Sequence, residues 1–511
     1  MARNNGQKHG SGELQALSSS SITQTSLLTH LKHYGSASAV SAVVGLITFP
    51  LLTRNLDVGS YGLLGLITMS ATMLVAFGKL GLQHSVLRFY PKAEQNIEEM
   101  DLARLHATAF VLIAALMIGS VFVWLVGGWL VVPHWLQNSS IPRYFSILAV
   151  FIVLRMLASI TGNMLRAKEH SRTLGNSVIA ARLIYLMLLL IAGVTFGLSV
   201  TAVLVITVLA EIVSLLICVI AYRPYMQFDR TKFSLQLSTT LLAYGLPLML
   251  MEAVYVLVRL MDRYMIGSML GEFELGQYAA SASLVLYAEM LVVGTVATAI
   301  KPRYNRLWES SGRVETTRFL NRGASFYISA GIPIVGLFVL IAPDALVFLA
   351  GERYLAGARV IPYFALAVFV DGLMVFLLAG IHLQGKTRLF LYWGVIAALM
   401  NFCGNYLLIP VLGISGAAMV SLFAYLFFVG GLWWSASRWL AVALPWRRIL
   451  YLTVLTLCVV ISLWLIPLQR GFHSGLLRVV LAVPLLAIIS LVIDRELWKW
   501  LTGRSLWKRG S

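Results

Sequence analysis

Long apolar runs separated by short, charge-bearing segments dominate the sequence from about residue 34 onward. A run of about 20 apolar residues is long enough to cross a bilayer as a helix, so this pattern predicts repeated membrane crossings. Only 12% of the 511 residues are charged, about half the share of a soluble domain, and the mean hydropathy is +0.84. The pattern excludes a soluble fold and leaves little mass outside the bilayer.

Fourteen apolar segments have the length of a span, which predicts an all-α polytopic membrane protein with about 14 transmembrane helices. An even number of crossings places both termini on the same side of the membrane. The segments are 34–53, 61–79, 106–132, 142–164, 175–196, 200–221, 241–262, 277–300, 324–346, 361–383, 389–410, 414–436, 449–467 and 475–493.

The distribution of cations predicts which side that is. The net charge is +18, from 39 Lys and Arg against 21 Asp and Glu. With the N-terminus inside, 29 of the 39 cations fall in inside segments, 7 in outside segments and 3 within spans. This bias predicts cytoplasmic termini by the positive-inside rule. Nucleic-acid binding, the other common cause of such an excess, is disfavoured because the cations form short clusters between apolar runs.

Motifs for metal, cofactor or covalent chemistry do not occur. The three cysteines lie in apolar runs without paired spacing, and no HExxH is present. We therefore expect no catalytic residue, no metal site and no cofactor. The polar tail 1–30 is predicted to be disordered in the cytoplasm, and the basic tail 495–511 to face membrane lipid there.

Internal repetition predicts the domain organisation. Ile141-Pro142 opens one span much as Ile361-Pro362 opens another, and Gly197 matches Gly413 at a nearly equal offset. These anchors predict two six-helix lobes around a central cavity, related by an axis along the membrane normal. The predicted units are the lobes 31–222 and 223–437, followed by two extra C-terminal helices in 438–494.

Several sequence blocks resemble the polysaccharide biosynthesis (Wzx-type oligosaccharide flippase) family. They are FPLLTRNLDVGSYGLLGLITMSA at 49–71, MDRYMIGSMLGEFELGQYAAS at 261–281, LAGERYLAGARVIPYF at 349–364 and NYLLIPVLGISGAAMVS at 405–421. The resemblance covers roughly residues 30–440. It implies the fold of drug antiporters and of the lipid II flippase, in the multidrug/oligosaccharidyl-lipid/polysaccharide exporter superfamily.

The resemblance also implies a function and partners. The expected activity is movement of a polyprenyl-pyrophosphate-linked oligosaccharide across the bacterial inner membrane, for O-antigen or exopolysaccharide biosynthesis. The expected partners are that lipid-linked oligosaccharide and the membrane lipids, with a polysaccharide polymerase and a chain-length regulator as further candidates.

Charged residues within the spans are the candidate site residues, because charge is costly at mid-membrane. Glu252, Tyr255, Arg259 and Asp262 share one face of a span, so Arg259 either pairs with Asp262 or grips the diphosphate of a cargo. The substrate-binding candidates are Arg259, Arg155, Tyr255 and Arg54, and the ion-coupling candidates are Glu252, Glu289 and Asp371.

For several of these candidates a purely structural role remains an alternative to a role in transport. Arg155 and Asp371 occupy nearly repeat-related positions, so they either bridge the lobes or flank the cargo. Arg54 either attracts the diphosphate on the release side or anchors to lipid headgroups. Two other functions also remain: an ion-coupled small-molecule or drug exporter of the same fold, and a membrane polysaccharide polymerase. The polymerase is disfavoured because no sizeable outside loop gathers reactive groups.

Overall fold

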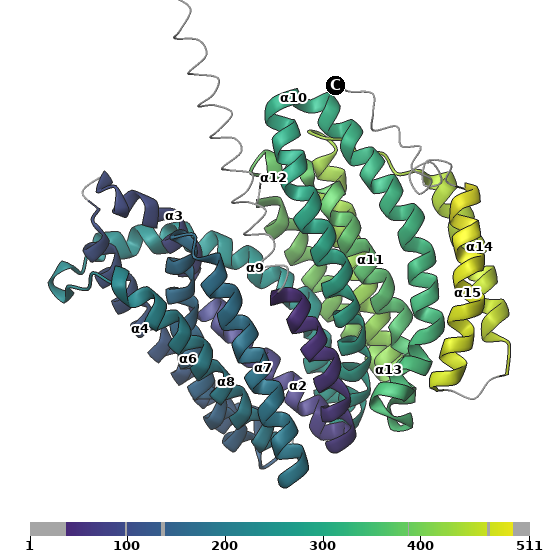
Figure 1. Ribbon diagram of the computed structural model, residues 1–511, viewed down its shortest axis with the longest axis horizontal. Helices are drawn as coiled ribbons and strands as arrows, with labels where there is room; N and C mark the ends of the chain where they lie inside the picture. Colours follow the sequence, from purple (N-terminus) through teal and green to yellow (C-terminus); the bar gives the residue numbers. More distant parts are fainter. Residues whose placement is uncertain (1–36, 98–99, 134–137, 387, 468–470, 494–511) are drawn as a thin grey trace, which may run out of the picture.

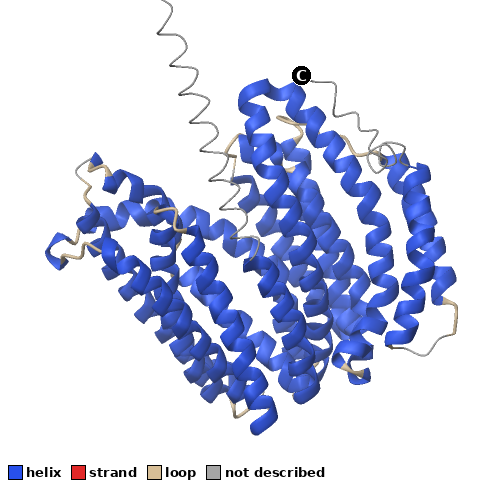
Figure 2. Ribbon diagram, viewed as in Figure 1, coloured by secondary structure: helices blue, strands red, loops and turns tan. Residues whose placement is uncertain are grey.

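The computed structural model describes residues 37–97, 100–133, 138–386, 388–467 and 471–493 (Figure 1). Within these ranges the regular structure is entirely helical (Figure 2). The predicted all-α membrane fold is therefore confirmed. The expectations for the tails 1–30 and 495–511 concern residues that lie outside the described part of the chain.

The N-terminal helices run back and forth in sequence order. They are the helix Ala37–Asn55, α2 (Val58–Gly78), α3 (Leu82–Glu94), α4 (Leu102–Val126), α6 (Ile141–Ala167), α7 (Ser171–Thr195) and α8 (Val200–Tyr222). A π-helical turn, η2 (Gly127–Val131), continues α4, and the short 3-10 helices η3 (Arg223–Tyr225) and η4 (Arg230–Lys232) lead out of α8.

The remaining helices begin with a long connecting helix, α9 (Leu235–Met269). After it come α10 (Glu272–Ala350), the 3-10 segment η5 (Glu352–Val360), α11 (Ile361–Leu377), α12 (Ala379–Leu383), α13 (Arg388–Ala436), α14 (Trp446–Trp464) and α15 (Phe472–Ile493).

Short polar side chains begin several of these helices by capping free backbone N–H groups. Asp57 accepts from the N–H of Ser60 at 2.9 Å before α2, and Asp101 accepts from that of Arg104 at 2.6 Å before α4. Ser234 does the same for α9. The Lys232 ammonium also contacts Asp101 and holds the pKa of that carboxyl below its ordinary value. The segment between α8 and α9 is thereby tied to α4.

Two of the long helices are hairpins. The backbone leaves helical geometry at Gly312 in α10 (φ 70°) and at Gly413 in α13 (φ 59°), where a positive φ favours glycine. Asn401 donates to Ser421 at 3.1 Å, and twenty residues of straight helix would separate them by about 30 Å. Twelve helices in the described residues qualify as spans by length and composition. That count takes the two arms of α13 as one helix and does not include the first arm of α10, so the predicted figure of about 14 crossings is approximate.

The chain alternates between two ends of the molecule, which we name after their turns. The Gly312 end also carries α3 and the segment between α8 and α9, and the Gly413 end also carries Gly197, Gly271 and η5. In Figure 1 the Gly312 end is at the top. Lys301, Arg303, Arg306, Arg313, Arg318 and Arg322 all lie near the Gly312 turn, at the end predicted to be cytoplasmic.

Figure 1 shows two groups of helices that lie together at the Gly413 end and diverge toward the Gly312 end, with α9 passing between them. The first part of α9 packs on the N-terminal helices: Ser85 of α3 donates to the carbonyl of Leu241 at 2.5 Å, and Gly81 meets Gly245 backbone to backbone. Its second part packs on α13. The predicted unit 223–437 includes all of α9 in the C-terminal lobe, whereas the first half of this helix contacts the N-terminal lobe.

The helices α14 and α15 pack against the second arm of α10. A fully buried ion pair joins them, between Asp344 of α10 and Arg478 of α15. Asp344 also accepts from the hydroxyl of Ser474 at 3.1 Å and from the N–H of Gly471 at 3.2 Å. These two helices are therefore attached to α10 by charge as well as by apolar contact.

Candidate functional site

A cavity of about 310 Å³ lies where α2 meets α9, α10, α11 and α13. It combines apolar walls with a group of ionisable side chains, an arrangement typical of ligand sites. The polar lining residues are Arg259, Asp262 and Arg263 from α9, Glu289 from α10, Tyr363 and Asp371 from α11, and Ser421 and Tyr425 from α13, while α2 contributes Met69.

Arg259 lines this cavity as predicted, but its carboxylate partner is not Asp262. Both terminal nitrogens donate to Glu289, at 2.9 Å to Oε1 and 2.7 Å to Oε2. Such a two-pronged pair is strong and directional. The Arg259 side chain is 36% exposed and that of Glu289 only 13%, so the guanidinium keeps a face toward the cavity. The expected Arg259–Asp262 pair is wrong because α10 brings a better-placed acid to Arg259 than the local helix does.

Asp262 is instead the start of a buried polar chain. Its carboxylate accepts from the hydroxyl of Tyr278, from Ser421 at 2.9 Å and from the N–H of Arg263 at 2.7 Å. Asn401 donates to Ser421 at 3.1 Å, and Asn405 donates to Asn401 at 2.9 Å. The Asn405 side-chain oxygen ends the chain, buried and without a hydrogen-bond partner in the described residues. An unsatisfied acceptor at this depth is costly and favours a cation or donor there.

The cavity also contains Arg263, which lies just beyond the predicted span 241–262 and was therefore expected in an outside segment. The error arose because the apolar run ends near residue 262 while α9 continues to Met269. Within the described residues the Arg263 guanidinium contacts the sulfur of Met69 and forms no ion pair with a carboxylate. None of the five N–H donors of this guanidinium therefore binds a carboxylate in the described part of the chain.

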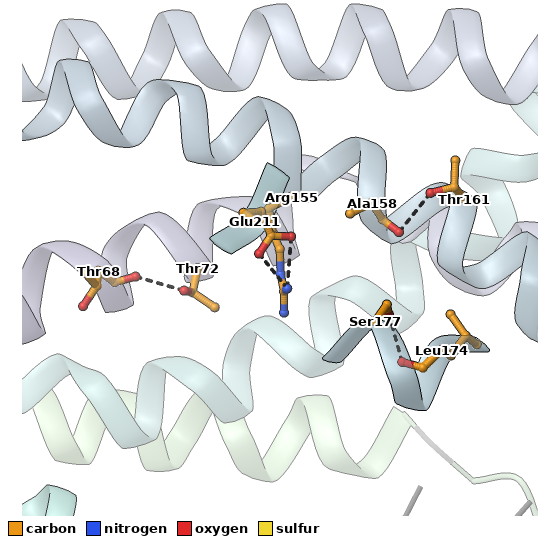
Figure 3. A network of polar contacts seen from close by, with 8 residues as sticks. All are labelled: Thr68, Thr72, Arg155, Ala158, Thr161, Leu174, Ser177 and Glu211. Atoms are coloured by element: carbon orange, nitrogen blue, oxygen red, sulfur yellow. Dashed lines mark hydrogen bonds and ion pairs between the residues drawn. The ribbon is translucent and has the colours of Figure 1, made fainter. Parts of the chain in front are cut away.

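Arg155 and Asp371 do not meet. One nitrogen of Arg155 donates to both carboxylate oxygens of Glu211, at 3.2 and 3.1 Å, and its other terminal nitrogen points away from that carboxylate (Figure 3). Asp371 accepts from the hydroxyl of Tyr425 in the other lobe's interior. The two residues thus sit in separate networks and do not form the bridge between the lobes that was one of the two alternatives, whereas contact of either with a cargo stays a prediction. Because its side chain is 48% exposed, Arg155 keeps donors for another partner.

The remaining acid of α9, Glu252, lies toward the Gly312 end. Its carboxylate is 3.6 Å from Nε2 of His84 on α3. Lys79, which directly follows α2, donates to Ser159 of α6 at 2.8 Å. Its ammonium group is close enough to interact electrostatically with the side chains of Glu252 and Arg155. Cations therefore lie at two levels, Lys79 and Arg155 on the N-terminal lobe and Arg259 and Arg263 in the cavity.

The other two predicted substrate residues fall elsewhere. The side chain of Tyr255 lies outside the described part of the structure. Arg54 lies at the Gly413 end, where it donates to the carbonyls of Phe348 and Leu349 at 2.6 and 3.3 Å. It thus contacts backbone rather than the cavity. No cluster of three or more His, Cys, Asp or Glu that could hold a metal occurs in the described residues.

Comparison with solved structures shows which fold this is. The chain is similar to the lipid II flippase MurJ in an inward closed conformation, with a TM-score of 0.71 and 14% identity, over 91% of this chain and 99% of that one. It is similar to an inward-facing MATE multidrug resistance transporter of the MOP superfamily, with a TM-score of 0.62 and 13% identity, over 78% and 94% of the two chains.

A third similar structure is a MOP superfamily transporter from Pyrococcus furiosus, described as having a binding pocket of reverse polarity. Its TM-score is 0.58 at 14% identity, over 81% of this chain and 94% of that one. At these identities the likeness concerns the fold alone. No curated protein matches the chain.

The family model for polysaccharide biosynthesis proteins matches residues 33–308, which is more than half of the chain. The match includes the sequence blocks of the N-terminal lobe, α9 and the first arm of α10. The chain therefore belongs to the polysaccharide biosynthesis protein family.

Proposed function

We propose that the protein is a flippase that moves a polyprenyl-pyrophosphate-linked oligosaccharide across the bacterial inner membrane, from the cytoplasmic to the outer leaflet, for a cell-surface polysaccharide. The observation that supports it most is a cavity lined by two arginines, of which Arg263 has no carboxylate partner among the described residues, in a member of the polysaccharide biosynthesis family. The fold shared with a lipid II flippase adds to this support.

The diphosphate is the part of such a cargo that the cavity is best suited to bind. Arg263 has no carboxylate partner among the described residues, and Arg259 presents the outer face of a guanidinium already oriented by Glu289. A guanidinium can hold two phosphate oxygens at once. Lys79 and Arg155 lie nearer the Gly312 end and offer a first contact for an anion that enters from there. The sugars would face the apolar and hydroxyl-bearing walls.

Orientation in the membrane follows from the same charges. The cations around the Gly312 turn and along α3 favour placing that end in the cytoplasm. Contacts between the lobes gather at the opposite end, so cargo would enter from the cytoplasmic leaflet in the conformation described here.

A coupling cation is best placed at the chain that runs from Asp262 to Asn405. This group offers a buried carboxylate, a serine hydroxyl and two amide oxygens, one of them without a partner. Oxygen ligands of this kind suit a hard cation such as Na⁺. The three acids predicted from sequence are less suited, since Glu289 is neutralised by Arg259 and Glu252 faces His84. Asp371, bonded to Tyr425, remains the alternative for a proton.

Purified protein in liposomes that contain a fluorescent polyprenyl-pyrophosphate oligosaccharide tests the function. A membrane-impermeant quencher reaches the label in the outer leaflet in any case, and we expect the label that starts in the inner leaflet to become accessible only when the protein is present. Arg263→Ala is expected to slow this movement strongly, whereas Arg318→Ala, an exposed arginine near the Gly312 turn, is the matched control. Equal rates with and without protein would refute the proposal.

Export of small cationic molecules is the second candidate, because the cavity holds three carboxylates, Asp262, Glu289 and Asp371, beside its two arginines. Excess negative charge in a low-dielectric cavity attracts cations. Liposomes loaded with a cationic dye separate the two functions: dye movement without movement of the lipid-linked sugar favours the exporter.

A further inference from the structure

Two arginines cross between the lobes at the Gly413 end, each to the last turn of a helix in the other lobe. Arg54, in the last turn of the helix Ala37–Asn55, donates to the carbonyls of Phe348 and Leu349, which belong to the last turn of α10. Arg353 of η5 donates in the opposite direction, to the carbonyl of Thr53 and, at 2.8 Å, to that of Leu56. Each lobe therefore supplies the cation and receives one.

The chemistry of helix ends explains why these contacts hold. The last four carbonyls of a helix have no partner within it, and the helix dipole places partial negative charge there. An arginine satisfies two such carbonyls at once and interacts favourably with the dipole. Since the two helices belong to different lobes, this capping joins the lobes instead of stabilising one helix alone.

Neighbouring contacts hold Arg353 in place. The buried amide of Gln277 on α10 donates to the carbonyl of Arg353 and accepts from the N–H of Gly357 at 2.9 Å. Tyr354 is fully buried, with its ring centre 6.0 Å from that of Tyr61 on α2. The segment η5 is thus fixed to α10 and presents its arginine to the opposite lobe.

The helices behind the arginines are in direct backbone contact. A Cβ on Gly62 of α2 would lie 2.5 Å from the backbone nitrogen of Gly276 on α10. The hydroxyl of Tyr61, next to Gly62 on α2, donates to that of Ser283 on α10 at 3.1 Å. This close contact blocks a path for an oligosaccharide at the Gly413 end while the arginines remain bound.

We propose that Arg54 and Arg353 form a reciprocal latch that keeps the Gly413 end closed and must release once in every transport cycle. The inference rests on the proposed function in one respect, that cargo leaves at this end. Release exposes four carbonyls to water and frees both arginines, so the latch sets how often the end opens, while the residues of the cavity bind the cargo.

Accessibility of Ser283 measures the latch without any cargo. The full-length protein, with Cys218, Cys403 and Cys458 changed to serine and Ser283→Cys added, is reconstituted in liposomes and exposed to a membrane-impermeant maleimide. Arg54→Gln and Arg353→Gln are each expected to raise the labelling rate on the order of tenfold, since each removes charged hydrogen bonds between the lobes. Arg54→Lys, which keeps the charge, is expected to give a smaller rise.

Arg359→Gln is the matched control, because Arg359 lies in the same segment but pairs with Glu274 of its own lobe at 3.5 Å. An unchanged labelling rate in both glutamine variants, or an equal rise in Arg359→Gln, would overturn the latch. Distances between spin labels at Asn55→Cys and Glu352→Cys give a second readout: the glutamine variants must populate longer distances. Neither measurement needs a substrate, so failure of the latch and failure of the flippase proposal are distinguishable.

Discussion

The ion pair between Asp344 and Arg478 gives the most quantitative test of how α14 and α15 are attached. The side chains are 1% and 2% exposed, and Nε of Arg478 has no hydrogen-bond partner in the described residues. Asp344→Ala removes the carboxylate that holds Arg478 and leaves a buried charge without its counterion. Losing one partner of such a pair costs about 3–5 kcal/mol, a factor of about 100 to 5,000 in the folding equilibrium.

Replacing both partners by apolar residues separates the cost of an unpaired charge from the value of the pair. Asp344→Leu combined with Arg478→Met leaves no buried charge, and we expect its free energy of unfolding to lie within about 1 kcal/mol of the parent protein. Glu315→Ala is the control, because Glu315 pairs with Arg318 on the exposed surface of α10. That change is expected to cost about 0.5 kcal/mol or less.

Reversible unfolding in mixed detergent micelles, followed by tryptophan fluorescence, measures these free energies. The reasoning is refuted if Asp344→Ala is no less stable than Glu315→Ala. It is equally refuted if the double apolar variant is as unstable as Asp344→Ala alone, because the loss would then come from packing and not from charge.

The cavity and the lobe contacts give three further predictions. Arg259→Ala and Glu289→Ala are each expected to lower the free energy of unfolding, and the double variant is expected to recover part of that loss. In a double-mutant cycle the coupling energy should be about 1–3 kcal/mol, whereas losses that simply add would contradict the ion pair. Arg155→Ala is expected to lower the free energy of unfolding by about 1–3 kcal/mol, because it leaves the buried Glu211 carboxylate without its arginine partner. An unchanged free energy of unfolding would be evidence against that ion pair. Gly276→Val would place a Cβ 1.9 Å from a backbone oxygen on α2, so labelling of Ser283→Cys is expected to rise, whereas an unchanged rate would show that the helices do not meet there.

The helical fold could be predicted from the sequence because the chain folds in a lipid bilayer. Every backbone polar group must be satisfied within the membrane, so a long apolar run has essentially one option, a helix. The runs therefore predicted a membrane fold made of helices. The matched Ile-Pro pairs mark corresponding helix starts, with Pro142 and Pro362 in the first turns of α6 and α11. Gly197 and Gly413 both adopt the positive φ that their place in turns requires.

The partners of the charged residues depended on the tertiary structure. Periodicity placed Arg259 and Asp262 on one face of α9, but only the packing of α10 against α9 decided that Arg259 binds Glu289 and that Asp262 binds Tyr278 and Ser421. A span predicted from hydropathy ends where charged residues begin, so Arg263 was expected in a loop. In the structure α9 continues past this residue, and Arg263 lines the cavity. Charges in a membrane are identified by their cost, which the sequence reveals, whereas their partners come from distant helices, which only the folded chain brings together.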